Sequence, residues 1–147
     1  MLRALECAKQ ALLLDEVPVG AVIYKDGVEI ASAHNLRETQ QNPLAHAECL
    51  VIQEAAKKLG TWRLIGCQIF VTLEPCPMCL AALQQARIDE VTYGARDPKG
   101  GALSLGYLYH QDLRTNHRFN VTEQLNAACS ELLSDFFKSR RKNSREK

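Results

Sequence analysis

The chain has 147 residues, of which 46% are hydrophobic and 24% are charged, and its formal net charge is +1. This composition is typical of a soluble globular protein, so we expect one domain that spans residues 1–147. It argues against a membrane protein, and Glu6 and Lys9 interrupt the apolar residues near the start, so we expect neither a membrane span nor a signal peptide.

The first half of the chain predicts a helix, a β-hairpin and a second helix. An apolar face recurs at helical spacing over residues 2–14. Two strand-like runs lie within residues 21–33, and the Asp26-Gly27 pair between them is a strong signal for a hairpin turn. A helical apolar pattern then covers residues 46–59 and stops at a glycine, which is a common helix end.

The middle of the chain predicts a strand, a helix and a parallel strand. Residues 67–72 are apolar on both faces, as in a central strand that helices cover. A helix is expected over residues 77–87 and a strand over residues 88–93. A strand-helix-strand unit has a right-handed crossover, and such folds bind ligands at the carboxyl ends of their strands.

The last part of the chain gives weaker signals. We expect a short helix over residues 103–109, a brief strand over residues 119–121, and a final helix that Thr122 caps. Residues 116–118, Asn-His-Arg, have two interpretations: they contact phosphate, or they form a buried hydrogen-bond network. The apolar residues at helical spacing within residues 125–137 predict a core-facing stripe.

Four residues form the chemical centre of the sequence. His46, Cys76 and Cys79 carry the nitrogen and sulfur ligands that Zn²⁺ prefers, and a catalytic zinc site keeps one position open for water. Pro77 favours a helix start at Cys76, where the helix dipole stabilises thiolates. Glu48 is left free to move protons, so the pattern predicts hydrolytic deamination of an amino-purine or amino-pyrimidine.

A structural zinc site is the alternative interpretation of these residues. A closed site needs a fourth ligand, and Cys49 lies one turn from His46 on the same predicted helix face. In that case the chain is an RNA-binding module and not an enzyme. The absence of a secretion signal makes the six cysteines typical of reduced thiols in the cytoplasm, and we expect those outside the zinc site to be mostly small buried residues.

Segments along nearly the whole chain resemble the bacterial tRNA-specific adenosine deaminases, the TadA family of the cytidine deaminase superfamily. The zinc motif by itself indicates only the superfamily. The later segments indicate the tRNA-acting branch, in place of a deaminase of free bases or nucleosides. The matching segments are Val17-Pro18-Val19-Gly20-Ala21-Val22, His34-Asn35, Ala45-His46-Ala47-Glu48, Leu73-Glu74-Pro75-Cys76, Gly94-Ala95-Arg96-Asp97, Asn116-His117-Arg118 and residues 132–137.

The resemblance implies a three-layer α/β/α fold of the α/β class, with a mixed five-stranded sheet. It also implies one zinc ion per subunit and a homodimer whose sites the neighbouring subunit completes. The implied reaction converts adenosine to inosine at the wobble position of a tRNA anticodon and releases ammonia. Asn35 would bind the target nucleoside, Val19 and Leu73 would line its pocket, and Asp97 would lie near the ribose. Without the resemblance, Asn35 is equally typical of a turn.

The end of the chain is basic. Residues 138–147 contain six basic residues and one acidic residue, a net charge of +5, which leaves −4 on the rest of the chain. A basic tail on a slightly acidic body indicates an anionic partner, here the anticodon arm of tRNA, although a charged and solvated terminus has the same composition. Phe136, Arg140 and Arg141 are the candidate RNA contacts, because aromatic side chains stack on unpaired bases.

Overall fold

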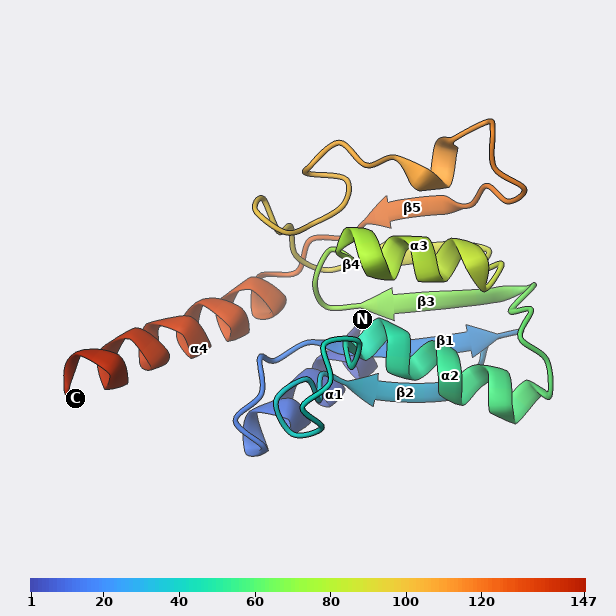
Figure 1. Cartoon of the computed structure of the whole chain (residues 1–147). Coiled ribbons are helices and arrows are strands. Elements are labelled where there is room, and N and C mark those ends of the chain that lie inside the picture. The colour runs from blue at the N-terminus through green and yellow to red at the C-terminus, as the bar shows by residue number, and fades with distance from the viewer.

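A mixed five-stranded sheet lies at the centre of the computed structural model, which describes residues 1–147 (Figure 1). The strand order is β2-β1-β3-β4-β5; β1 is antiparallel to both of its neighbours, whereas β3, β4 and β5 are parallel. The hairpin and the parallel crossover predicted from the sequence are therefore confirmed. The strands are β1 (Gly20–Lys25), β2 (Val28–His34), β3 (Cys67–Val71), β4 (Glu90–Tyr93) and β5 (Asn120–Glu123).

Helices cover both faces of this sheet. In Figure 1, α2 and α3 lie on the near face, α1 lies behind the sheet, and α4 projects away from the body. The α/β/α architecture expected from the sequence is confirmed. None of the helices combines the length and the apolar character that crossing a membrane requires. The helices are α1 (Leu2–Leu13), α2 (Ala47–Leu59), α3 (Pro77–Gln85) and α4 (Ala127–Arg145).

Strand β1 shows how the sequence separates the two layers of the core. Side chains alternate between the faces of a strand. Ala21 and Ile23 belong to the large core cluster under α2 and α3, whereas Val22 packs in a separate small cluster with residues of α1. All three are fully buried, which makes β1 a central strand covered on both sides.

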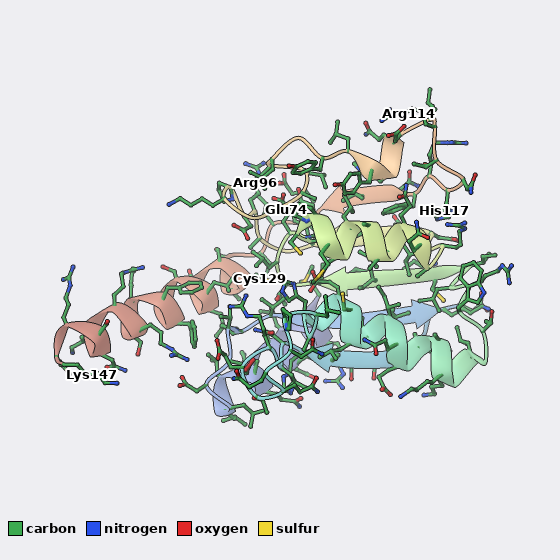
Figure 2. The ribbon with its side chains drawn as sticks, in the orientation of Figure 1. Glu74, Arg96, Arg114, His117, Cys129 and Lys147 are labelled. Carbon is green, nitrogen blue, oxygen red and sulfur yellow. The ribbon has the colours of Figure 1, made fainter.

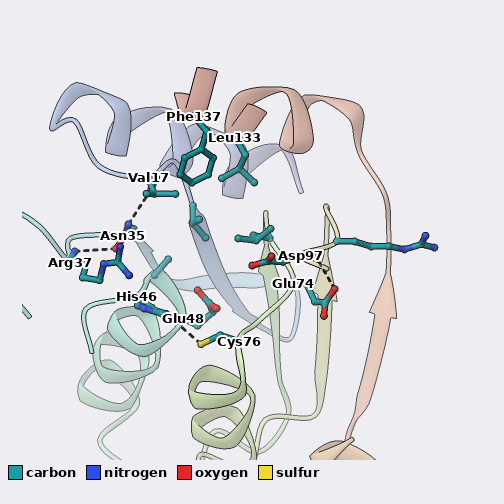
Figure 3. Close-up of a pocket in the computed structure, with 14 residues that line it drawn as sticks. Val17, Asn35, Arg37, His46, Glu48, Glu74, Cys76, Asp97, Leu133 and Phe137 are labelled. Carbon is teal, nitrogen blue, oxygen red and sulfur yellow. Dashed lines mark hydrogen bonds between the residues drawn. The ribbon is translucent and has the colours of Figure 1, made fainter. Parts of the chain in front are cut away.

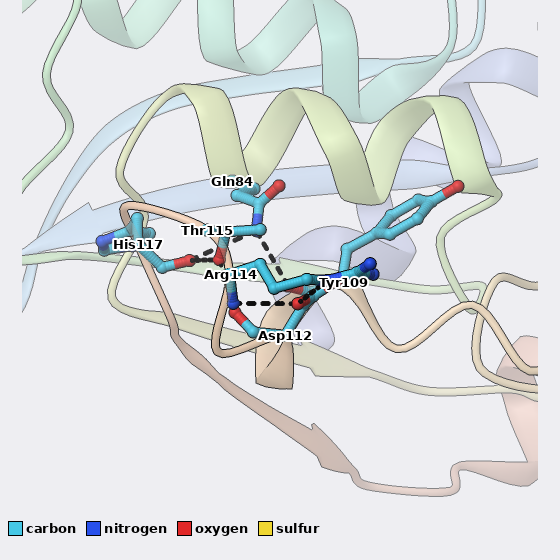
Figure 4. A network of polar contacts seen from close by, with 6 residues as sticks. All are labelled: Gln84, Tyr109, Asp112, Arg114, Thr115 and His117. Atoms are coloured by element: carbon cyan, nitrogen blue, oxygen red, sulfur yellow. Dashed lines mark hydrogen bonds and ion pairs between the residues drawn. The ribbon is translucent and has the colours of Figure 1, made fainter.

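The predicted helix at residues 103–109 is wrong. Only a single 3₁₀ turn, Tyr109–Gln111, forms in this region, and the preceding residues are turns. Gln84 on α3 donates its side-chain amide to the carbonyl oxygens of Tyr109 (2.8 Å) and His117 (3.2 Å), as Figure 4 shows. His117 also contacts the carbonyl oxygen of Ile88 at 2.6 Å. Contacts with α3 and the core therefore shape the segment, and His117 belongs to a structural hydrogen-bond network.

The start of the last helix also differs from the prediction. Thr122 lies inside β5, and Asn126 caps α4 by accepting a hydrogen bond from the backbone of Ala128 (2.9 Å). Only Cys129 and Leu133 are buried; Leu132 and Phe136 are half-buried, and the rest of the expected core stripe is exposed. Figure 2 shows Cys129 where the helix meets the body and Lys147 at its distant end. The basic terminus is helical up to Arg145.

Gly20 is the point where α1 approaches β1 most closely. A Cβ atom there would lie 2.1 Å from the carbonyl oxygen of Ala4 and 2.5 Å from the backbone nitrogen of Ala8. We expect Gly20→Ala to lower the free energy of unfolding in urea by about 1 to 3 kcal/mol, because backbone atoms must move. Gly27→Asn, at an open turn position with positive φ, is the control and should change it by less than about 0.5 kcal/mol. Equal stability of both variants would contradict this packing.

Candidate active site

A cavity of about 410 Å³ opens at the edge of the sheet where β3 and β4 end and where α2 and α3 begin (Figure 3). The three predicted metal ligands and Glu48 lie close together at this edge. Polar groups therefore converge at the base of the cavity, and apolar side chains form part of its walls. The lining residues are Val17, Val19, Asn35, Arg37, His46, Ala47, Glu48, Leu73, Glu74, Cys76, Arg96, Asp97, Leu133 and Phe137.

The ligand atoms of His46, Cys76 and Cys79 all lie within 4.8 Å of one another. Nδ1 of His46 is 3.6 Å from Sγ of Cys76 and 3.4 Å from Sγ of Cys79. Tetrahedral zinc with ordinary Zn–N and Zn–S bonds separates its nitrogen and sulfur ligands by about 3.6 Å. The donor set and its spacing therefore fit a zinc ion held by one imidazole and two thiolates.

Two helix starts produce this arrangement. His46 is the N-cap of α2 and has an extended backbone (φ −72°, ψ 151°), so its ring lies ahead of the helix. Cys76 is the N-cap of α3, Pro77 occupies the first turn, and Cys79 follows on that turn. Both helix dipoles direct their positive ends at the cluster, which favours the thiolate form of its cysteines.

Glu48 lies beside this cluster on the first turn of α2 and lines the cavity. Its side chain is almost completely buried, with 4% of the residue exposed. Burial is the largest cause that raises the pKa of Glu48, to about 7. A carboxyl group with a pKa near neutrality is able both to accept and to donate a proton at physiological pH. Glu48 is thus suited to general acid and base chemistry.

The two cysteines of the cluster have pKa values shifted in opposite directions. Hydrogen bonding with Cys79 is the largest cause that lowers the pKa of Cys76, to about 4. Hydrogen bonding with Cys49 and Cys76, together with burial, raises the pKa of Cys79. Hydrogen bonding with Cys76 also raises the pKa of His46. Binding of a divalent cation would displace the remaining protons, because zinc ligands bind as thiolates and neutral imidazole.

Cys49 lies next to the cluster but outside it. Its Sγ is 3.8 Å from Sγ of Cys79, yet it is not among the atoms that converge on a common point. The cluster therefore offers three candidate ligand atoms, and His46 and Cys76 line the cavity beside it. Three ligands and an open position characterise catalytic zinc sites, whereas structural sites have four protein ligands. Among the other cysteines, Cys7, Cys67 and Cys129 are buried free thiols, as expected.

The residues expected to bind the nucleoside all line the cavity, namely Asn35, Val19, Leu73 and Asp97. The side chain of Asn35 donates to the carbonyl oxygen of Val17 (3.3 Å) and accepts from the backbone of Arg37 (3.0 Å). Asn35 therefore holds the turn at the end of β2. An amide group has two N–H donors and two acceptor lone pairs, so one of each is left for a ligand.

The expected RNA contacts on α4 take three different positions. Phe137 lines the cavity, whereas Phe136 does not and instead packs beneath the guanidinium of Arg140 (5.0 Å). Arg140 also contacts the carboxylate of Asp15 at 3.1 Å, which ties α4 to the end of α1. Arg141 shares a shallow surface with Lys138, Lys142, Arg145 and Glu146.

Glu74 is a buried residue to which the sequence analysis gave no role. Its carboxylate accepts hydrogen bonds from the backbone of Asp97 (3.1 Å) and from both the backbone (2.9 Å) and the hydroxyl (2.7 Å) of Ser104. A Cβ at Gly101 would lie 1.9 Å from this carboxylate, so only glycine permits the approach. Glu74 thus fixes the loop that carries Asp97 onto the segment that carries Cys76.

Several other lining residues were also missed. Val17, Arg37, Arg96 and Leu133 lie on four separate segments and meet only in the folded chain. Arg96 pairs with the carboxylate of Glu123 through two nitrogens, one of them at 2.7 Å. The only sequence signal was position, because Val17, Arg96 and Leu133 lie within segments that resemble the deaminases.

Comparison with known proteins identifies extensive similarity. A family model of MafB19-like deaminases matches residues 1–141. The tRNA-specific adenosine deaminase of Bacillus subtilis is 50% identical over 143 residues, which cover 97% of this chain and 89% of that protein. A structure solved in studies of A-to-I editing by tRNA:A34 deaminases at the wobble position superposes with a TM-score of 0.83, at 43% identity over 88% of this chain and 95% of that one. A guanine deaminase from Bacillus subtilis is less similar, with a TM-score of 0.63 and 33% identity over 95% of this chain and 90% of that one.

The stability of the metal-free protein is expected to depend on pH through Glu48. Between its ordinary pKa of 4.5 and its folded-state pKa of about 7, the folded protein keeps a proton that the unfolded chain releases. The free energy of unfolding therefore falls as pH rises through this window, by up to about 3 kcal/mol, and stays lower above it. Glu48→Gln should remove this contribution, so its stability relative to the wild type should increase with pH. Urea unfolding with a chelator at about pH 5 and about pH 8 measures the difference. If the difference in the free energy of unfolding between Glu48→Gln and the wild type does not change with pH, Glu48 is not a buried, uncharged carboxyl group.

Proposed function

Because the chain belongs to the family of tRNA-specific adenosine deaminases, we propose that His46, Cys76 and Cys79 hold a catalytic zinc ion and that Glu48 transfers protons beside it. The reaction is the deamination of adenosine to inosine at the wobble position of a tRNA anticodon. The position of Glu48 carries this proposal: it is a buried carboxyl with a pKa of about 7, it lines the same cavity as His46 and Cys76, and it is not one of the clustered ligands.

The roles of the side chains follow from their positions. A zinc ion held by His46, Cys76 and Cys79 would polarise a water molecule for attack on the ring carbon that bears the amino group. Glu48 takes the two protons of this water one after the other and delivers the first to the ring nitrogen and the second to the leaving amine, so that water is consumed and ammonia is released. Burial of Glu48 excludes bulk water from this proton transfer.

The walls of the cavity are suited to a single nucleoside. Val19 and Leu73 offer apolar surface to the base, and the remaining donor and acceptor of Asn35 are available to its polar edge. One carboxylate oxygen of Asp97 accepts a hydrogen bond from the backbone of Gly100 (3.1 Å). The other oxygen is available to a ribose hydroxyl. A base from a single-stranded anticodon loop is already unpaired, which lowers the cost of placing it here.

The basic helix α4 is proposed to hold the anticodon arm. Phe137 reaches the cavity from this helix, while the side chains of Arg141 and its basic neighbours lie further along it and away from the body. Arg140 contributes by anchoring the helix through Asp15 and by packing on Phe136. Lysine and arginine side chains on one helix face supply the salt-dependent attraction to phosphates that dominates RNA affinity.

Three further features are proposed for the assembled protein. Residues 1–147 form a single zinc-dependent deaminase domain with one zinc ion per subunit. Exposed apolar side chains at Leu105, Tyr107, Leu108 and Leu113 support a homodimer, since a patch of this kind commonly marks a protein interface. Six free thiols and a tRNA substrate support a cytoplasmic location. Light scattering measures the oligomeric state directly.

Glu48→Ala tests the mechanism. The variant should retain about one zinc per chain, because Glu48 is outside the ligand cluster, and it should lose nearly all turnover, because proton transfer fails. Zinc content by metal analysis and inosine formation from an anticodon stem-loop, measured beside free adenosine, cytidine and guanine, give both results. Activity equal to the wild type would refute the mechanism.

Cys49→Ser is the matched control for that experiment. It changes a side chain next to Cys79 that is not one of the three clustered ligands, so zinc and activity should both be retained. If instead the substitution strips the metal, the ion has four protein ligands and the site is structural. In that outcome the proposed catalytic role of zinc is wrong.

Removal of the basic side chains of α4 tests the RNA surface. Deletion of residues 138–147 should weaken tRNA binding and reduce its dependence on salt, but it also removes the anchor between Arg140 and Asp15. The combined substitution of Arg141, Lys142 and Arg145 by alanine keeps the anchor and should lower the slope of log K against log salt by about two to three. Alanine at Lys57 and Lys58, near the end of α2, is the control. Unchanged tRNA affinity in the α4 variant would show that RNA binds elsewhere.

A further inference from the structure

Two arginines, Arg37 and Arg96, line the cavity, and a third, Arg140, lies on α4, but only Arg37 has a free guanidinium group. Arg96 is paired with Glu123, and Arg140 contacts the carboxylate of Asp15 at 3.1 Å and its carbonyl oxygen at 2.7 Å. Arg37 lines the cavity, and its side chain makes no hydrogen bond or ion pair with any other residue of the chain. Its five N–H donors are thus free to bind an anion.

The backbone of Arg37 is held in place on both sides. Its N–H donates to the side chain of Asn35 (3.0 Å), and its carbonyl oxygen accepts from the backbone of Asn42 (3.0 Å). The base of the same loop is closed by a hydrogen bond from the backbone of Leu36 to the carbonyl oxygen of Ala45 (3.0 Å). An arginine on a fixed backbone loses less conformational freedom when it binds a ligand.

A buried carboxylate holds the rest of this loop. Glu16 is fully buried, and its oxygens accept from the backbone of Thr39 (2.8 Å), the hydroxyl of Thr39 (3.3 Å) and the backbone of Glu38 (3.3 Å). No lysine or arginine pairs with Glu16. Two loop amides and one loop hydroxyl therefore satisfy this carboxylate, and it fastens the loop after β2 to the segment that leads from α1 into β1.

We propose that Arg37 binds a backbone phosphate next to the target nucleotide of the RNA, and that Glu16 is the positioning residue that holds the Arg37 loop in the binding conformation. The inference rests on the proposed function, because it requires an RNA strand with one base inside the cavity. The phosphates that flank such a base remain at the mouth, and a guanidinium group matches phosphate oxygens in a bidentate manner. Arg37 and Phe137 lie on different sides of the cavity (Figure 3), so this contact is separate from α4.

Arg37→Ala tests the phosphate contact. With an anticodon stem-loop as the substrate, we expect KM to rise about tenfold while kcat at saturation stays near the wild-type value. The slope of log KM against log salt should fall by about 0.7, the value for one phosphate contact on a single strand. Arg37→Lys keeps the charge but loses the bidentate geometry, so it should retain the salt slope and recover only part of the affinity.

Arg63→Ala is the control, because Arg63 is an exposed arginine that packs on Trp62 beyond the distant end of α2. This variant should keep the KM, the kcat and the salt slope of the wild type. Wild-type KM and salt slope in Arg37→Ala would overturn the inference and leave the proposed function intact. Failure of the proposed function gives a different result, since the wild-type protein itself would then form no inosine from the stem-loop.

A double-mutant cycle tests the role of Glu16. Glu16→Gln replaces one acceptor oxygen by a donor and should loosen the loop, so KM should rise several-fold with kcat and zinc content unchanged. In the Arg37→Ala background the same substitution should have almost no further effect on KM, because the contact that it positions is already absent. Equal effects in both backgrounds would overturn the positioning role. If Glu16→Gln does not fold, Thr39→Val removes a single hydroxyl donor to Glu16 and should change KM in the same direction.

Discussion

The meeting of two helix starts at one edge of the sheet determines the rest of the structure. Nδ1 of His46 and the two cysteine sulfurs, 30 and 33 residues later in the chain, lie 3.4 to 3.6 Å apart because α2 and α3 both begin there. His46 projects ahead of α2 only because it is the N-cap and has an extended backbone. If His46 lay one residue further into the helix, its ring and the side chain of Glu48 could not both face the cavity. The position of the helix boundary is therefore as important as the identity of the ligands.

Buried carboxylates shape the cavity on both sides of this metal site. Glu16 accepts hydrogen bonds from the loop after β2, and Glu74 accepts them from the loop after β4. Backbone and hydroxyl donors satisfy both groups, so they hold loops without a paired cation. Glu48 differs, because it lies beside the histidine and cysteine cluster and burial raises its pKa to about 7. Buried carboxyl groups thus anchor loops in two cases and supply the proposed proton-transfer group in the third.

Much of the fold and the centre of the site were predictable from local sequence signals. Asp26-Gly27 identified the hairpin, and the spacing of the histidine and cysteines identified the metal cluster. The segment before the 3₁₀ turn at Tyr109–Gln111 was wrongly predicted as a helix because contacts with Gln84, which is distant in sequence, hold this region in another conformation. The contacts of Glu16 with the loop after β2 were missed for the same reason. Hydrogen bonds between segments 20 or more residues apart leave no periodic pattern in the sequence.

The continuity of α4 has a consequence for how the protein discriminates between RNA molecules. Phe137 on this helix lines the cavity, and Arg145 lies eight residues later on the same rod, about 12 Å further along its axis. The contact between Arg140 and Asp15 fixes the direction of the rod. If α4 holds the anticodon arm as proposed, this fixed distance limits binding to RNA whose backbone lies at the matching distance from the base in the cavity.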